Sequence, residues 1–197
     1  DTHRVHYLTS SVTARMDWVL DGEGVATVKI DGSCCAIIHG ELYKRYDAKK
    51  GKPVPEGAIK CQDEADPITG HLPCWVKCDR NNPADKWFWA AYDSSINVKK
   101  DCKILSFGTT KVTLNEALPD TEIKTYEAVG EHFECNPYNL SGDMLVRHGE
   151  DKIEVERTYE GLRDFLSENY IEGIVFWKDG EPRCKIKRSD FFLEWGR

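Results

Sequence analysis

The feature that most constrains the fold is a pair of strand-forming segments late in the sequence, Ile171–Trp177 and Arg183–Arg188, separated by Asp179-Gly180. Asp-Gly between two such segments favours a tight turn whose twist matches that of paired strands. The pattern therefore predicts an antiparallel β-hairpin. Lys185 and Lys187 are two residues apart on its second strand, so both side chains point to one face.

Several earlier segments also predict strands. Val25–Val28 leads into Lys29, and Cys34–Ile38 and Leu42–Tyr46 form a second hairpin turning at His39-Gly40. Lys29 is thus expected in a loop between strands, held at both ends. A further strand is expected over Thr121–Val129 and carries Glu127.

Two helices are expected. Asn82 followed by Pro83 is typical of a helix start, and the aromatic residues over Trp87–Tyr92 are expected in the core. Thr158 is expected to cap the second helix, whose inward residues are Leu162, Phe165 and Leu166. Residues 48–73 are rich in Gly, Pro and charge, which is typical of a long surface excursion.

Composition limits the class of protein. At 197 residues, 40% hydrophobic and 31% charged, the chain is expected to be one globular domain over residues 1–197, and disorder and coiled coil are excluded. Apolar runs fall short of the roughly 18 residues of a membrane span, and the start has no signal-peptide core. We therefore expect no membrane association, a cytoplasmic or nuclear location and a monomer.

The net charge of −7 argues against binding nucleic acid through the field of the whole protein. Positive charge is instead local, in two runs: Lys44, Arg45, Lys49, Lys50 and Lys52, and Arg183, Lys185, Lys187 and Arg188. The first run is equally typical of a solvated face. The eight cysteines lack paired metal-ligand spacing, so reduced thiols are preferred over a structural metal.

The segment Lys29-Ile30-Asp31-Gly32 indicates nucleotidyl transfer to a lysine. A lysine amine has an ordinary pKa of about 10.4 and becomes a nucleophile only when burial or neighbouring cations disfavour its charge. Lys185, Lys187 and a divalent metal would do this and neutralise a triphosphate. Asp31 and Gly32 suit a tight loop, and Glu127 and Glu172 suit ribose hydroxyls or magnesium. A structural role for Glu127 remains open.

Four segments taken together resemble motifs I, III, IV and V of the covalent nucleotidyltransferases, which include DNA ligases, RNA ligases and mRNA capping guanylyltransferases. They are Lys29–Gly32, Tyr126–Gly130, Glu172–Phe176 and Lys185–Arg188. Residues 69–76 and 134–140, followed by Arg147-His148-Gly149, resemble RNA ligases related to the vertebrate 5′–3′ RNA ligase.

This resemblance implies an α+β, antiparallel β-rich, two-sheet domain of the ATP-grasp-like ligase class, with a few helices and ATP bound between its sheets. Only nine residues follow Arg188, so in a departure from DNA ligases and capping enzymes no C-terminal OB domain is expected. It implies that Lys29 becomes AMP-linked and that Arg45 contacts ribose or the RNA end. It further implies that Glu127 and Glu172 hold ribose and metal, with Glu172 as the metal ligand, and that Lys185 and Lys187 hold the phosphates.

The expected function is an RNA ligase that uses ATP with Mg²⁺ or Mn²⁺ and joins RNA 5′-phosphate and 3′-hydroxyl ends. Lysyl-AMP and adenylylated RNA are its expected intermediates. Two alternatives remain: a GTP-dependent capping guanylyltransferase, and a non-catalytic nucleic-acid-binding module of the same fold.

Overall fold

The computed structural model describes residues 8–96, 104–113 and 123–196, which form two compact units. Unit 1 comprises Asp1–Asp31, Cys102–Leu114 and His148–Arg197, and unit 2 comprises Gly32–Asp101 and Asn115–Arg147. The chain passes from unit 1 to unit 2 between Asp31 and Gly32, inside the predicted nucleotidyl-transfer segment. That residues 1–197 form one nucleotidyltransferase domain stays a prediction.

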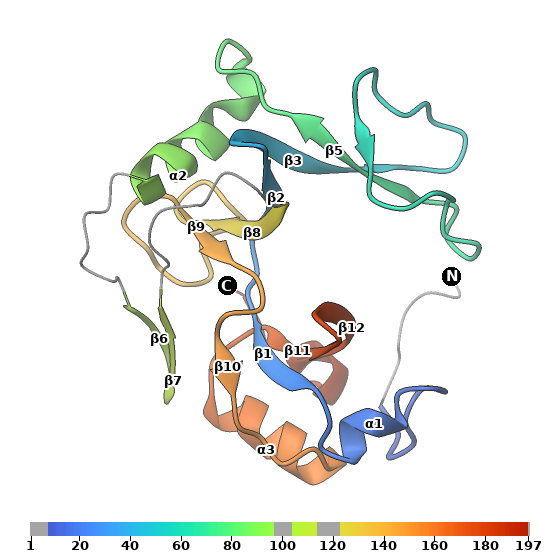
Figure 1. The fold of residues 1–197 in the computed structure, drawn as a ribbon. Coiled ribbons are helices and arrows are strands. Elements are labelled where there is room, and N and C mark those ends of the chain that lie inside the picture. The colour runs from blue at the N-terminus through green and yellow to red at the C-terminus, as the bar shows by residue number, and fades with distance from the viewer. Residues whose placement is uncertain (1–7, 97–103, 114–122, 197) are drawn as a thin grey trace. The chain divides into compact units, whose positions relative to one another are not determined.

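Unit 1 contains a four-stranded antiparallel sheet with the strand order β10-β1-β11-β12 (Figure 1). Its strands are β1 (Val25–Lys29), β10 (Lys152–Ile153), β11 (Gly173–Lys178) and β12 (Glu181–Lys187). The unit also holds the pair β6 (Ile104–Phe107) and β7 (Thr110–Thr113), helices α1 (Asp17–Leu20) and α3 (Tyr159–Glu168), and the 3-10 turn η2 (Arg188–Phe191).

The predicted hairpin is confirmed as β11–β12. Asp179 and Gly180 form its turn with φ values of 56° and 76°, as the Asp-Gly sequence requires. Its ends differ from the prediction: β11 begins after Glu172, and β12 ends before Arg188. Arg188 instead opens η2, where its side chain is buried.

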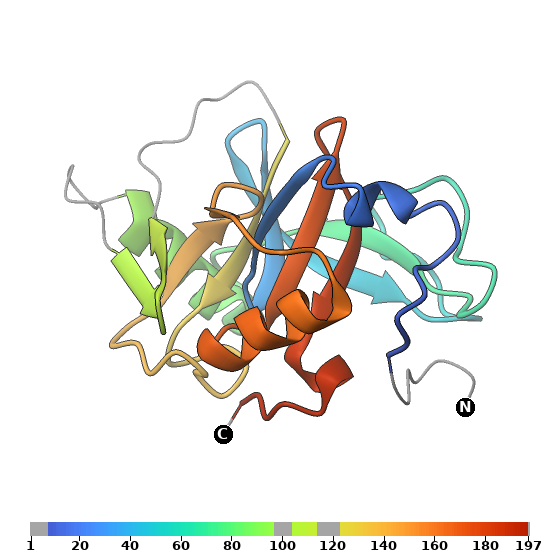
Figure 2. The ribbon, with the colours of Figure 1, turned by 90° about the horizontal axis from the view of Figure 1, so that it is seen from below.

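Helix α3 confirms the prediction made from Thr158. The Thr158 hydroxyl accepts a hydrogen bond from the Gly161 amide at 3.1 Å, which satisfies one of the unpaired donors at the helix start. Leu162 and Leu166 are buried, whereas Phe165 is only partly buried. Figure 2 shows α3 lying across one face of the unit 1 sheet.

Unit 2 contains a six-stranded antiparallel sheet in the order β4-β5-β3-β2-β8-β9 (Figure 1). The strands are β2 (Ser33–Ile38), β3 (Glu41–Ala48), β4 (Ile59–Lys60), β5 (Leu72–Lys77), β8 (Lys124–Val129) and β9 (Met144–Arg147). The predicted β2–β3 hairpin is confirmed, with a turn at His39-Gly40 whose φ values are 50° and 76°. Strand β8 carries Glu127 as predicted; residues 121–122 lie outside the described part of the chain.

The predicted first helix is confirmed as η1 (Pro83–Asp85) followed by α2 (Lys86–Ile96). The Asn82 side chain accepts a hydrogen bond from the Ala84 amide at 3.0 Å. Phe88, Trp89 and Tyr92 pack against the unit 2 core, as expected. For Trp87 the core expectation is wrong, because the residue is 37% exposed and its ring stacks on the His132 ring with centroids 3.2 Å apart.

These elements confirm an α+β, antiparallel β-rich architecture with few helices. Among the described residues every cysteine is a free thiol; Cys102 lies outside them. The pKa of the Cys34 thiol and that of the Cys78 thiol are each raised to about 12, mainly by burial. Both thiols are therefore protonated near neutral pH. No helix among the described residues is long and apolar enough to cross a membrane.

Candidate functional site

The register of the unit 1 sheet places three predicted site lysines on one face. Lys29 pairs with Gly173, and Gly173 pairs with Lys187, so the three residues lie abreast on neighbouring strands. Paired residues of an antiparallel ladder share a face, and the faces alternate along each strand. Lys185 therefore shares the face of Lys187 and Lys29. We call this the lysine face.

Gly173 leaves the middle of the lysine face without a side chain. A Cβ at this position would overlap the Ile186 carbonyl, so β12 approaches β11 too closely for any residue but glycine. The backbones of Lys29 and Lys187 lie two strand spacings apart, about 10 Å. The register thus places Lys29 and Lys187 on either side of Gly173 on one face of the sheet.

The opposite face of the same strands is apolar. Val28, Ile174 and Ile186 are paired across β1, β11 and β12, and Val28 and Ile174 are buried. Because this face packs against the interior of unit 1, the alternating lysines must project to the other side. The core of unit 1 therefore fixes the direction of all three lysines.

Glu172 forms an ion pair with the Lys29 ammonium. The Glu172 side chain is only 13% exposed, and burial, the largest influence, raises the pKa of its carboxyl. The charge of Lys29 opposes this shift; more weakly, Asp31 raises the pKa of Glu172 and Lys187 lowers it. Lys29, Asp31, Glu172 and Lys187 thus form one electrostatically coupled group.

Asp31 has a partner that the sequence did not predict. Its carboxylate accepts a hydrogen bond of 2.8 Å from the indole N–H of Trp195. The two residues are separated by 164 positions, and a tryptophan near a polar segment carries no sequence signal of such a contact.

Two predicted positions need correction. Lys29 was expected in a loop, but it is the last residue of β1, so its backbone is fixed by pairing with β11. Glu172 was expected on the hairpin, but it precedes β11. Its carbonyl accepts a hydrogen bond of 2.9 Å from the Arg188 amide, which ties it to the residue that follows β12.

Three predicted residues, Gly32, Arg45 and Glu127, lie in unit 2. Gly32 is needed for close approach, because a Cβ there would overlap the Ala128 carbonyl of β8. Arg45 pairs with Asp47 at 2.8 Å and lies over the Trp75 ring at 5.9 Å from its centroid. The structure therefore accounts for Gly32 through packing rather than through a turn.

Glu127 lies directly opposite Cys34 in the pairing of β8 with β2. After burial, the charges of Glu127 and Arg45 are the strongest influences on the pKa of the Cys34 thiol, the first raising it and the second lowering it. Arg45 and Glu127 thus both act on Cys34, so unit 2 brings a cation and a carboxylate together on one face of its sheet.

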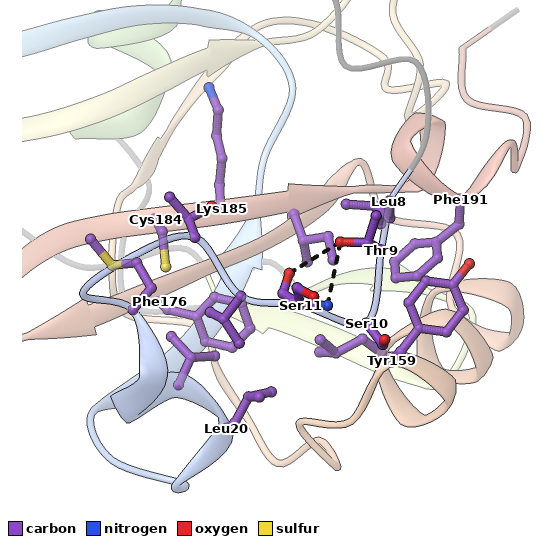
Figure 3. A pocket seen from close by; sticks show the side chains of 16 residues that line it. Leu8, Thr9, Ser10, Ser11, Leu20, Tyr159, Phe176, Cys184, Lys185 and Phe191 are labelled. Carbon is purple, nitrogen blue, oxygen red and sulfur yellow. Dashed lines mark hydrogen bonds between the residues drawn. The ribbon is translucent and has the colours of Figure 1, made fainter.

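A cavity of about 160 Å³ lies beneath β12 in unit 1 (Figure 3). Phe176, Cys184 and Ile186 line it from the sheet, and the amine of Lys185 points away from it (Figure 3). Ligand pockets usually measure about 300–1,000 Å³. A nucleoside triphosphate would exceed this cavity and meet an apolar wall in place of cations, so the cavity is not the nucleotide site.

Comparisons with known proteins place these residues in context. No protein-family model matches the chain. It is 26% identical to RNA ligase 1 of Danio rerio, a match that covers 86% of this chain and 68% of that protein. RNA ligase 1 of Pongo abelii and of Rattus norvegicus are 24% and 25% identical, each over 87% of this chain and 68% of theirs.

The chain is related to RNA ligases. The resemblance drawn from its motifs is confirmed at that level, whereas membership of the wider nucleotidyltransferase superfamily stays a prediction. The roles of Lys29, Asp31, Glu172, Lys185 and Lys187, and of Gly32, Arg45 and Glu127, also stay predictions. The structure adds that the five residues from Lys29 to Lys187 in this list lie in one unit. All of them except Lys185 belong to the electrostatically coupled group.

The raised pKa of Glu172 predicts a pH-dependent effect of Glu172→Gln on stability. Because the folded-state pKa lies above the ordinary value of 4.5, the contribution of this carboxyl is complete below pH 4.5 and is lost as the pH rises through the folded pKa. Glutamine cannot ionise. The free energy of unfolding of the variant, relative to wild type, should therefore increase as the pH rises from 4.5 through the folded-state pKa.

Denaturant unfolding at several pH values measures this difference, and Glu181→Gln is the matched control. Glu181 is an exposed residue of the same hairpin, so the corresponding difference should stay nearly constant with pH. A difference for Glu172→Gln that stays flat or falls with pH would contradict the assigned burial.

Proposed function

We propose that this chain is an ATP-dependent RNA ligase with a nucleotidyltransferase fold of the ATP-grasp-like ligase class. The observation that carries the proposal is the Lys29–Glu172 ion pair on a sheet face that also bears Lys185 and Lys187. Similarity to proteins named RNA ligase 1 supports RNA as the substrate class.

Lys29 is the proposed nucleophile. Its Nζ must lose a proton and leave Glu172 before it can attack, because only the neutral amine has a free electron pair. Nζ then bonds to the α-phosphorus of ATP while the bond from that phosphorus to the bridging oxygen of the β-phosphate breaks. Pyrophosphate leaves, and Lys29 carries AMP.

Two further transfers complete the proposed reaction. An oxygen of the RNA 5′-phosphate attacks the AMP phosphorus and releases the Lys29 amine, giving adenylylated RNA. The 3′-hydroxyl of the second end then attacks the RNA phosphate, loses its proton and displaces AMP. Lys185 and Lys187 are proposed to hold the phosphates and to stabilise the charge that grows on them.

The carboxylates fit a hard divalent cation. Asp31 raises the pKa of Glu172, which means that two negative groups lie close enough to repel each other, and carboxylate oxygens are the preferred ligands of Mg²⁺ and Mn²⁺. Glu172 would therefore hold the metal that enters with ATP. The metal would supply Lewis-acid polarisation of the phosphates.

The residues of unit 2 receive their proposed roles from the resemblance. Arg45 would contact ribose or the RNA end and Glu127 would hold ribose, while Gly32 allows its own backbone to lie close to β8. A cytoplasmic or nuclear location and a monomeric state are part of the same proposal.

The first test is covalent labelling with α-labelled ATP and magnesium, read on a denaturing gel. Wild type should take the label, and Lys29→Ala should take none because no amine remains to bond phosphorus. α-Labelled GTP should label weakly or not at all. Equal labelling of Lys29→Ala would remove this residue from the mechanism, and a preference for GTP would favour a capping guanylyltransferase.

The lysines of the β11–β12 hairpin are expected to differ in their effect on labelling, because Lys185 and Lys187 lie on the lysine face. Lys185→Ala or Lys187→Ala should reduce labelling roughly 10- to 1,000-fold, the range for a lost transition-state charge contact. Lys178→Ala is the control, because Lys178 is at the end of β11 and pairs with Glu23 at 2.5 Å, an ion pair that is partly exposed. An equal loss in all three variants, with circular dichroism unchanged, would refute the assignment to one face.

Substrate choice is a further prediction of the proposed function. Sealing should be efficient when the strand bearing the 3′-hydroxyl ends in RNA and weak when it is all DNA, since a 2′-hydroxyl is what distinguishes the two. With a net charge of −7, binding should depend on a few local phosphate contacts and weaken only modestly with salt. Gel analysis of matched nicked duplexes measures this, and efficient sealing of all-DNA nicks would rule out the RNA assignment.

A further inference from the structure

Phe192 is both strongly exposed and held in an unfavourable backbone conformation. The residue is 76% exposed, more than any other large hydrophobic residue in the described part of the chain. Its φ of 59° lies in the left-handed region, which bulky residues rarely adopt because the Cβ crowds the following carbonyl. An exposed aromatic residue that is held in such strain points to a role in binding.

The turn at Phe192 does not require an aromatic side chain. Phe192 is the residue that ends η2, and its amide donates to the Ser189 carbonyl at 3.2 Å. The next amide, that of Leu193, returns to the Arg188 carbonyl at 3.1 Å. A left-handed residue commonly ends a helix in this way, and glycine adopts the conformation without strain. Glycine would therefore make the same turn more easily, so turn formation does not account for the ring.

The backbone on both sides of Phe192 is fixed. Phe191 is buried and packs on Tyr159 with ring centroids 5.3 Å apart. The guanidinium of Arg188 is also buried, and it donates to the Glu194 carbonyl at 2.8 Å. A buried charge requires such partners, so this bond is costly to break. A ligand could therefore bind the Phe192 ring without first ordering the backbone that carries it.

The exposed ring stands alone along the chain. Phe191 is buried, Leu193 is only partly exposed, and Glu194 is charged and exposed. A stable protein interface usually covers about 800 Å² on each partner and has an apolar core, whereas a nucleobase needs a single aromatic face. An isolated ring therefore fits a base better than it fits an apolar protein surface.

Cations that suit phosphates lie just before Phe192 in the same segment. Lys185 and Lys187 lie at the end of β12 on the lysine face, and η2 leads from there to Phe192. Because a 3-10 helix rises by about 2 Å per residue, the backbones of Lys187 and Phe192 are roughly 10 Å apart. This short separation allows a single strand whose phosphates contact the lysines to place an unpaired base against the ring.

We infer that Phe192 is a stacking platform for an unpaired base of single-stranded RNA. The choice of RNA as the ligand rests on the proposed function. Bases that are not paired stack on exposed aromatic side chains, and every base has a π-face to offer. The Phe192 ring therefore adds affinity for single-stranded RNA with little preference for sequence.

Three variants of Phe192 separate base stacking from other contacts. Phe192→Gly removes the ring and suits the turn, Phe192→Leu keeps an apolar side chain and the backbone strain, and Phe192→Tyr keeps an aromatic ring. Fluorescence anisotropy measures the dissociation constant of a short, labelled single-stranded RNA with a 5′-phosphate, in the absence of ATP. Phe192→Gly and Phe192→Leu should bind this RNA roughly tenfold more weakly than wild type, and Phe192→Tyr nearly as tightly.

Abasic positions in the same RNA give an independent measurement. Removing the base that stacks on Phe192 should weaken binding to wild type and leave binding to Phe192→Gly unchanged. Equal binding by Phe192→Gly and wild type, or no RNA binding by wild type, would overturn the inference. Wild-type affinity in Phe192→Leu would overturn it as well, because the contact would then be apolar and would not involve stacking.

Thermal unfolding checks that the ring is free to bind. Phe192→Gly should melt at or above the wild-type temperature, because strain is removed and no buried contact is lost. A lower melting temperature would show that the ring packs on the protein in solution and would overturn the inference. Wild type that binds RNA through Phe192 but takes no label from ATP would overturn the proposed function alone.

Discussion

Strand register in the unit 1 sheet is the constraint on which the candidate site depends. Lys29, Gly173 and Lys187 lie abreast on β1, β11 and β12, and Val28, Ile174 and Ile186 occupy the other face. A slip of one residue would turn the lysines into the apolar interior and the isoleucines into solvent. The three ammonium groups therefore project from the sheet when its apolar face is buried. The free energy that folds the unit also assembles the lysine face.

This arrangement brings both attracting and repelling charges together in the group around Lys29. The face gathers cations, and Glu172 and Asp31 introduce carboxylates at the ends of β1 and β11. Burial makes the charge of Glu172 costly, Lys29 offsets part of that cost, and Asp31 adds to it. The group is stable as an ion pair, and its lysines and carboxylates could also bind a ligand that carries both phosphates and a divalent cation. A polyphosphate–metal complex would satisfy the lysines and the carboxylates together.

The hairpins, the two main helices and the shared face of Lys185 and Lys187 could be predicted from sequence, because each depends on local turn chemistry, capping or period-two alternation. Strands β4 to β7, β9 and β10 were not predicted, and β4 and the first two residues of β5 lie within residues 48–73, which were expected to be a surface excursion. The two residues of β4 and of β10 are too few for a period, and β10 lies in an acidic run. The ion pair of Lys29 with Glu172 spans 143 positions, so only the resemblance brought these residues together before the structure did. The Asp31–Trp195 contact lacked even that signal.

Arg188 illustrates why residue type and sequence position are insufficient to assign a role. It follows Lys187 directly, yet the strand ends between them and the chain turns into η2, so the two cations face different surroundings. Lys187 lies on the lysine face, where its charge acts on Glu172, while Arg188 is buried and bonded to backbone carbonyls. A planar guanidinium with five donors suits several fixed carbonyls, and a compact ammonium suits a phosphate that arrives and leaves. The different roles of Lys187 and Arg188 thus follow from the position at which β12 ends.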